Sequence, residues 1–299
     1  MKKNNRKTKH SKRKKTHKKT KKLRCSPNPK NHNKFTCYDN EDLYKLRDLW
    51  NIRHPDAQIE STEVHVIWNN LNQNMRNICD KESCWLKQNF VGKMDRNKLI
   101  HAFAPVAPAT WKKKPNEWLS STEIIDVMRQ YERAYKCFTF IGPSPIDYDT
   151  RKLYGQCIWP ELCNFSLKEL INKNKNKVGM IFNLDPHYLP GSHWVSIFVN
   201  IKKKLIFYFD SAGAPIPDQL MKLVNTITQQ GNALGIHFKF DQNYPVEHQY
   251  GNTECGVYAL YFIVHMLQDK INNHYLKTHI LKDKFIEGFR KIYFNEEKI

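Results

Sequence analysis

Residues 193–210 read HWVSIFVNIKKKLIFYFD and contain two apolar runs around a short basic connection. The β-branched and aromatic residues of these runs predict two antiparallel strands, His193–Val199 and Leu205–Asp210. If Ile201–Lys202 is a two-residue turn, the first residue of one strand lies directly opposite the last residue of the other. Opposed Cβ atoms are about 4.5 to 5.5 Å apart, so the Asp210 carboxylate could accept a hydrogen bond from the His193 imidazole. The hairpin therefore predicts a histidine base and an acid that orients its ring.

A candidate nucleophile follows further along the chain. The polar stretch QYGNTECG at 249–256 leads into an apolar run, Cys255–Leu267, that is long enough for a buried helix. A thiol at a helix N-terminus is favoured as thiolate, and the Cys255 backbone N–H can point at a developing oxyanion. Gly256 would let a substrate approach closely. The plain alternative, a small buried apolar cysteine, suits Cys137 better because apolar strand-like residues follow it.

The rest of the C-terminal part alternates predicted strands and helices, which indicates an α+β fold. Ser120 and Glu123 have the spacing of a capping box, so a helix should begin there. Residues 41–114 contain short apolar clusters between polar connectors and are predicted to be mostly helical. Further predicted elements are strands at 178–184 and 237–241 and helices at 218–230 and 285–293.

These blocks together resemble the active-site motifs of adenain and the SUMO-specific proteases. The shared features are His193-Trp194, Asp210 seventeen residues later, Gln249 six residues before Cys255, and the upstream pair Trp118-Leu119. The resemblance covers about residues 116 to 270. It implies a papain-like or adenain-like cysteine protease core, with a small central mixed sheet flanked by helices and a mostly helical accessory region before it.

The resemblance also implies a role for each residue. Cys255 would attack a peptide carbonyl, His193 would exchange protons with it, and Asp210 would hold His193 in place. Gln249 would donate its side-chain amide to the oxyanion. Trp194 and Trp118 would line a narrow channel that admits Gly-Gly before the cleaved bond, although core packing is the plain interpretation of both tryptophans.

The substrate is the open part of this interpretation. Where SUMO proteases usually have an acidic residue shortly after Trp-Leu, this chain has Ser120-Ser121. The accessory segment, size and basic N-terminus look more like the proteases of large cytoplasmic DNA viruses that process structural polyproteins after Gly-Gly. We therefore expect a viral endopeptidase of the virion and host cytoplasm. The alternatives are a protease that deconjugates SUMO or a ubiquitin-like protein, and a non-enzymatic basic protein that binds nucleic acid with a degenerate protease fold. The alternative location is the nucleus.

Charge is unevenly distributed along the chain. The 299 residues carry a formal net charge of +20, yet residues 1–38 contain 16 Lys/Arg and no acid. We expect a disordered basic tail at 1–38, an accessory region at 39–115 and the protease core at 116–299. Two interpretations of the tail stay open: a solubilising or localising arm, and a phosphate-binding or nuclear-address segment. In the second, Lys12, Arg13, Lys14 and Lys15 are representative of residues that would bind nucleic acid without sequence preference.

The eight cysteines are scattered, and none of the spacings is typical of a structural zinc site. We expect reduced thiols, no disulfides, no metal and no cofactor. The sequence also lacks the apolar stretch of about 18 residues that spans a bilayer and the apolar segment of a signal peptide, so no membrane association is expected.

Overall fold

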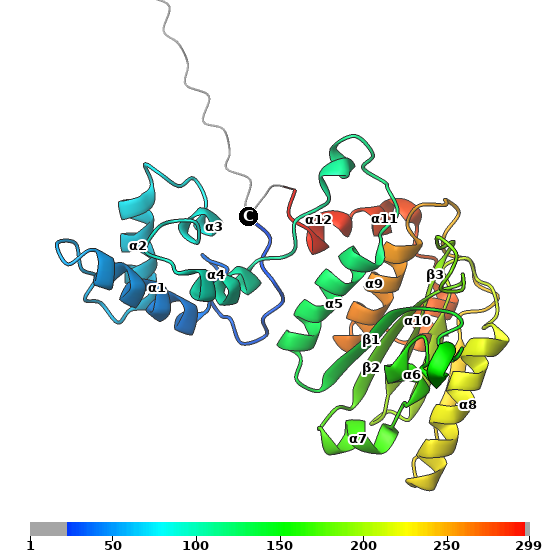
Figure 1. Cartoon of the computed structure of the whole chain (residues 1–299). Coiled ribbons are helices and arrows are strands. Elements are labelled where there is room, and N and C mark those ends of the chain that lie inside the picture. Colours follow the sequence, from blue (N-terminus) through cyan, green and yellow to red (C-terminus); the bar gives the residue numbers. More distant parts are fainter. Residues whose placement is uncertain (1–22, 297–299) are drawn as a thin grey trace, which may run out of the picture.

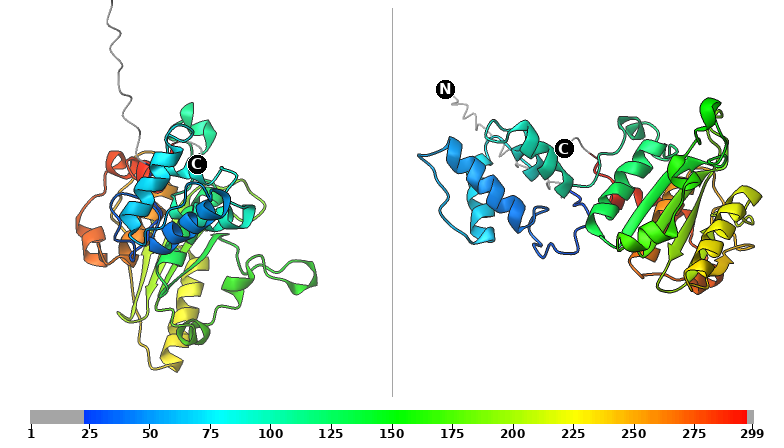
Figure 2. Two further views of the ribbon diagram at one scale, coloured as in Figure 1. Left: turned by 90° about the vertical axis from the view of Figure 1, so that its left-hand side faces the viewer. Right: turned by 60° about the horizontal axis from the view of Figure 1, so that its bottom comes forward.

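The computed structural model describes residues 23–296 as a helical N-terminal unit followed by a larger α/β unit (Figure 1). The N-terminal unit contains α1 (Asn40–Arg53), α2 (Val64–Met75), α3 (Glu82–Trp85) and α4 (Lys93–Leu99), with short 3-10 helices at Ile100–Ala102 and Ala109–Lys112. Its helices enclose a small apolar core around Leu43, Ile67 and Trp85. The predicted helical accessory region is confirmed, and Figure 2 shows it beside one end of the α/β unit.

The α/β unit is built on one mixed sheet with the strand order β1-β2-β3-β4-β5. The strands are β1 (Phe138–Pro145), β2 (Lys177–Asn183), β3 (Trp194–Asn200), β4 (Leu205–Phe209) and β5 (Lys239–Gln242). The two outer pairs are parallel and the two inner pairs are antiparallel. This arrangement confirms the predicted small mixed sheet with flanking helices.

Helices cover both faces of the sheet, which explains why the inner strands are apolar almost throughout. On one face α5 (Ser121–Ala134) and α9 (Cys255–Leu267) pack against side chains such as Phe198, and on the other α8 (Asp218–Ala233) packs against neighbours such as Ile197 (Figure 1). The remaining elements are a 3-10 turn (Leu153–Gly155), α6 (Pro160–Cys163), α7 (Leu167–Asn172), α10 (Asn273–Thr278), α11 (Asp283–Glu287) and α12 (Arg290–Tyr293).

The register of the central hairpin differs from the predicted one. Ser196 pairs with Phe209 and Asn200 with Leu205, so residues 201–204 form a four-residue connection and not a two-residue turn. The predicted register is therefore wrong by two residues. Because side chains alternate between the faces of a sheet, a shift of two leaves His193 and Asp210 on the same side as diagonal neighbours. Their predicted meeting survives the error in loop length.

The predicted boundary of the tail at residue 38 is also wrong. Tyr38 is fully buried in the core of the accessory unit, and the backbone of Cys25 forms an antiparallel β-bridge with that of Phe103. The backbone N–H of Arg24 donates a hydrogen bond to the Asn295 side chain near the C-terminus. The segment 23–38 is therefore part of the folded unit. Lys12, Arg13, Lys14 and Lys15 lie outside the described residues.

The expectation of reduced thiols throughout is corrected by three disulfides. They join Cys25 to Cys37, Cys79 to Cys84 and Cys157 to Cys163, with Cα–Cα distances of 5.0, 5.5 and 6.4 Å. Each pair closes a short loop, and the folded loop brings the two sulfur atoms together in a way that spacing alone does not reveal. Only Cys137 and Cys255 carry free thiols among the cysteines, all of which lie within 23–296.

Within residues 23–296 no helix has the length and apolar character of a membrane span, and no three His, Cys, Asp or Glu side chains are clustered as metal ligands would be.

Candidate active site

Three elements of the α/β unit bring the predicted catalytic residues to one end of the sheet. His193 immediately precedes β3, Asp210 immediately follows β4, and Cys255 is the first residue of α9, which packs under both strands. In an antiparallel pair the start of one strand and the finish of its neighbour lie at the same end of the sheet. The N-terminal thiol of the apolar helix α9 therefore lies at the same end of the sheet as His193 and Asp210.

His193 and Asp210 form a short hydrogen bond, with 2.6 Å between Nε2 and Oδ1. The Asp210 side chain is buried, and its Oδ1 also accepts the backbone N–H of Ala212 at 2.9 Å. Asn243 holds the backbone of Asp210 from the opposite side, because it accepts from the Asp210 N–H and donates to the Asp210 carbonyl. The carboxylate is thus fixed before it orients the imidazole.

The pKa of His193 is set by burial and by the neighbouring Asp210 and Cys255. Burial lowers the pKa of His193, but hydrogen bonds to Asp210 and Cys255, together with their negative charge, outweigh burial and raise the pKa from 6.5 to about 10. Because Nε2 is occupied by Asp210, Nδ1 is the ring nitrogen left for the thiol. The raised pKa keeps the His193 imidazole protonated at neutral pH, next to the N-terminal thiol of α9.

Gln249 is held from three directions, and its side chain is buried. Its Nε2 donates to the Gly251 carbonyl at 2.8 Å, its Oε1 accepts from the Ser211 hydroxyl at 2.7 Å, and its backbone N–H donates to the Ser211 carbonyl. A primary amide has two N–H groups, so one remains for another acceptor.

The two tryptophans border an open cleft of about 490 Å³ beside this edge of the sheet. The indole Nε1 of Trp194 donates to the Leu119 carbonyl at 2.9 Å, which ties the start of β3 to the segment before α5. Trp118 is 45% exposed, so core packing does not explain it. The other lining residues are mixed and include the apolar Trp159 and Leu189 as well as Asn183, Asp185 and His187.

Gly256 packs closely against Leu119 at the start of α9. A Cβ added there would lie 2.9 Å from the Leu119 Cβ, closer than such atoms approach in proteins. Glycine is therefore required at 256 by the close packing of α9 against Leu119, and the expectation that it makes room for a substrate has no support in these contacts.

Comparison with known proteins identifies the family of this chain. Residues 164–299 match the Ulp1 protease family, C-terminal catalytic domain. A thiol protease of Acanthamoeba polyphaga mimivirus is 31% identical over 225 residues, which are 72% of this chain and 69% of the relative. The chain belongs to the Ulp1 protease family of cysteine proteases.

Two further similarities extend this assignment. A cysteine protease of African swine fever virus is 35% identical over 109 residues, 35% of this chain and 39% of the relative. The crystal structure of an African swine fever virus protease has the same fold, with a TM-score of 0.64, 20% identity, and coverage of 92% of this chain and 96% of that one. The likeness therefore includes the helical accessory unit as well as the protease core.

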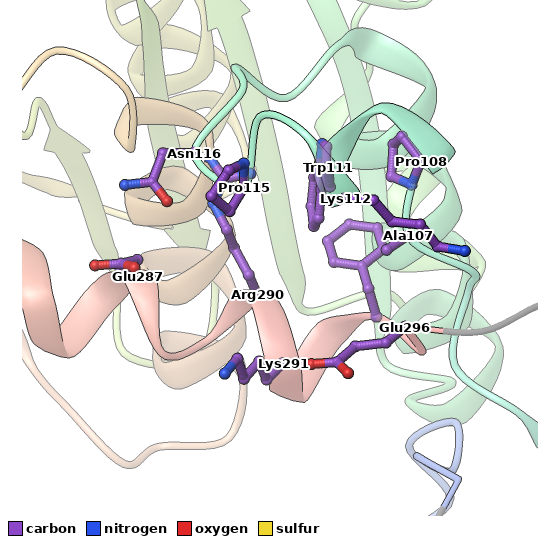
Figure 3. A pocket seen from close by; sticks show the side chains of 11 residues that line it. Ala107, Pro108, Trp111, Lys112, Pro115, Asn116, Glu287, Arg290, Lys291 and Glu296 are labelled. Carbon is purple, nitrogen blue, oxygen red and sulfur yellow. The ribbon is translucent and has the colours of Figure 1, made fainter. Parts of the chain in front are cut away.

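In this Ulp1-family chain the residue before Cys255 is anchored to a helix near the C-terminus. Glu254 is buried and accepts two hydrogen bonds from Arg290 of α12, at 2.8 and 3.1 Å. The Arg290 guanidinium also lies 4.6 Å from the centre of the Trp111 ring, and both line a cleft of about 400 Å³ together with Pro115 (Figure 3). Breaking a buried ion pair is costly, so this contact fixes where α9 begins.

Sequence reasoning missed four of the supporting residues: Ser211, Asn243, Glu254 and Arg290. Two signals were available for them, since Ser211 directly follows the predicted Asp210 and Glu254 directly precedes Cys255. Asn243 and Arg290 carry no local signal, because each acts across more than 30 residues of chain.

The pH dependence of the protease should change when Asp210 is replaced by asparagine. The pKa of His193 is raised in the folded protein. Its imidazolium therefore contributes fully to the free energy of unfolding below pH 6.5, and this contribution is lost as the pH rises through about 10. Asp210→Asn removes the negative charge and should lower that pKa, which moves the basic limb of the kcat/KM profile down by about one to three pH units. Profiles of both proteins on one peptide test this; an unmoved basic limb would contradict it.

Proposed function

We propose that this protease is an endopeptidase whose catalytic residues are Cys255, His193 and Asp210. The observation that carries the proposal is the 2.6 Å hydrogen bond between His193 and the buried Asp210 carboxylate, with Cys255, the first residue of α9, among the groups that raise the pKa of His193. Cys255 transfers its proton to His193, its sulfur bonds to the peptide carbonyl carbon, and the carbonyl oxygen becomes an oxyanion. His193 then protonates the leaving amine as the C–N bond breaks, and water hydrolyses the thioester.

We further propose that the oxyanion is bound by the Cys255 backbone N–H and by the free N–H of Gln249. The first N–H groups of a helix have no partner within the helix, and Cys255 is the first residue of α9. Gln249 lies six residues earlier in the chain with its amide already oriented. Donors that are fixed before the reaction stabilise a developing charge without reorganisation.

Replacement of Gln249 by alanine should lower kcat by roughly ten- to a thousandfold, the range for losing one oxyanion donor, with little change in KM. The reason is that the lost hydrogen bond forms only as charge develops on the oxygen. Steady-state kinetics on a Gly-Gly-containing peptide measure this. A variant with a raised KM and an unchanged kcat would instead make Gln249 a substrate-binding residue.

For the substrate, we propose protein chains with Gly-Gly before the cleaved bond, as in structural polyproteins of a virus that replicates in the host cytoplasm. The exposed Trp118 and the adjacent Trp194 border the cleft and would exclude large side chains next to the cleaved bond. Similarity to thiol proteases of mimivirus and African swine fever virus supports a viral role.

A second candidate substrate is a SUMO-like protein. African swine fever virus relatives described as SUMO-1 cysteine proteases are 31% to 33% identical over 113 to 116 residues of this chain. The two substrates can be separated by comparing kcat/KM on a SUMO-reporter fusion and on a capsid-polyprotein peptide with a Gly-Gly site. Preference for the folded fusion by more than about tenfold would favour deconjugation. If neither substrate is cleaved, the result would favour the alternative of a non-enzymatic protein that binds nucleic acid.

The basic N-terminus should bind nucleic acid independently of catalysis. Residues 1–22 contain 13 Lys/Arg and no acid, so their binding to DNA should be weakened steeply by salt and show little sequence preference. A chain that begins at Leu23 keeps the segment packed in the accessory unit and should retain kcat/KM on a short peptide while losing most DNA affinity. Filter-binding salt titrations beside a peptide assay test this. Unchanged DNA affinity would assign binding to the folded body.

A further inference from the structure

We propose that Ser211 is a positioning residue that orients and polarises the Gln249 amide for oxyanion binding. This inference rests on the proposed function, in which Gln249 is the side-chain donor. Ser211 is itself buried, and its hydroxyl donates to Gln249 Oε1 across 2.7 Å.

The direction of this hydrogen bond follows from the neighbour on the other side of the amide. The Gly251 carbonyl can only accept, so the group 2.8 Å from it must be the Gln249 NH₂ and not the amide oxygen. The amide oxygen then faces Ser211, which must donate its proton to it. A flipped amide would place two oxygen atoms against each other at Gly251 and would turn the remaining N–H away.

Ser211 should also strengthen Gln249 as a donor. A hydrogen bond to the oxygen of an amide polarises the whole group and makes its N–H more positive, an effect that is larger in a buried site. The side chains of both residues are buried at the end of β4, where the effective dielectric constant is low. Loss of the Ser211 hydroxyl would thus leave the Gln249 oxygen without its side-chain partner and weaken the donor.

The main chain of Ser211 serves the same end. Its carbonyl accepts the backbone N–H groups of both His248 and Gln249, which places the irregular segment after β5 beside the end of β4. The preceding residue, Asp210, orients His193. Two adjacent residues, Asp210 and Ser211, therefore position the proposed base and the proposed oxyanion donor.

The test is kinetic and uses the full chain. Ser211→Ala should lower kcat about tenfold with little change in KM, an effect smaller than that of Gln249→Ala because the donor is still present. In the double variant Ser211→Ala/Gln249→Ala, kcat should equal that of Gln249→Ala alone, because Ser211 acts through Gln249. Ser196→Ala is the matched control, since Ser196 is a buried serine whose hydroxyl has no hydrogen-bond partner among residues 23–296.

A second readout separates positioning of Gln249 from damage to the neighbouring Asp210. Alkylation of Cys255 by iodoacetamide needs the thiolate but forms no oxyanion, whereas a Gly-Gly peptide aldehyde forms an oxyanion when it adds to the thiol. Ser211→Ala should alkylate at the wild-type rate but bind the aldehyde more weakly. Ser211→Cys, which keeps a weak donor, should fall between alanine and serine in kcat.

The outcomes are distinct. Additive losses in the double variant, or slower alkylation of Ser211→Ala, would overturn the inference, because Ser211 would then act on the whole site or on the base. An unchanged kcat in Ser211→Ala beside a strong loss in Gln249→Ala would overturn it as well. If Gln249→Ala itself kept full kcat, the failure would lie in the proposed role of Gln249.

Discussion

Replacement of Cys255 by alanine is expected to abolish peptide cleavage, by at least about a thousandfold, while the fold persists. The substitution removes the only atom that can form the thioester. It removes little packing, because the side chain loses a single sulfur at the first position of α9. Peptide assays with product detection by mass spectrometry would measure the residual rate, and the midpoint of thermal unfolding would report on the fold.

Cys137 provides the control for this variant. It is the other free cysteine and is half-buried after α5, so Cys137→Ala removes a thiol without touching the site. A Gly-Gly vinyl probe should label the wild type and Cys137→Ala once, and Cys255→Ala not at all. Cleavage by Cys255→Ala above a few per cent of the wild-type rate would assign the nucleophile to another residue.

Loss of His193 should be nearly as damaging. His193→Ala removes the group that takes the thiol proton and the positive charge that stabilises the thiolate, and it leaves the buried Asp210 without the partner at 2.6 Å. We expect kcat to fall by at least about a thousandfold, because removing any one residue of a group that acts together removes most of the catalytic effect of the whole group. Alkylation of Cys255 at pH 7 should slow as well, since the thiolate loses its counterion.

His237→Ala is the comparison for the histidine variant. His237 is exposed and hydrogen-bonds to Asn232 at the end of α8, away from the three catalytic candidates. Its replacement should leave both cleavage and alkylation unchanged. If His193→Ala retained a tenth of the wild-type kcat, a different base would have to serve Cys255, and the imidazole contact would be structural only.

Much of the site could be predicted because its signals are local. A capping box needs only Ser120 and Glu123, and the structure has both of its hydrogen bonds. The helix that presents Cys255 is an unbroken apolar run, and such a run can be stable only if it is buried. The order of His193, Asp210, Gln249 and Cys255 along the chain pointed to the same family that the comparisons identify.

Other features depend on contacts between distant segments, and no local pattern encodes them. The length of the 201–204 connection decides the hairpin register, whereas the turn expected at Ile201–Lys202 has only two residues. The disulfides depend on how loops close, and the need for glycine at 256 depends on Leu119, which lies more than 130 residues earlier.

The sequence by itself therefore determined the fold class, the helical accessory region and the identity of the residues at the edge of the sheet. Residue types and their periods carry that information, because helices and strands bury one side chain in every few residues. Only the tertiary structure decided which groups fix these residues by hydrogen bonds: Ser211 bonds to Gln249, Asn243 to Asp210, and Arg290 to Glu254. Such contacts form when polar groups that are buried together must satisfy one another, and folding alone determines which groups those are.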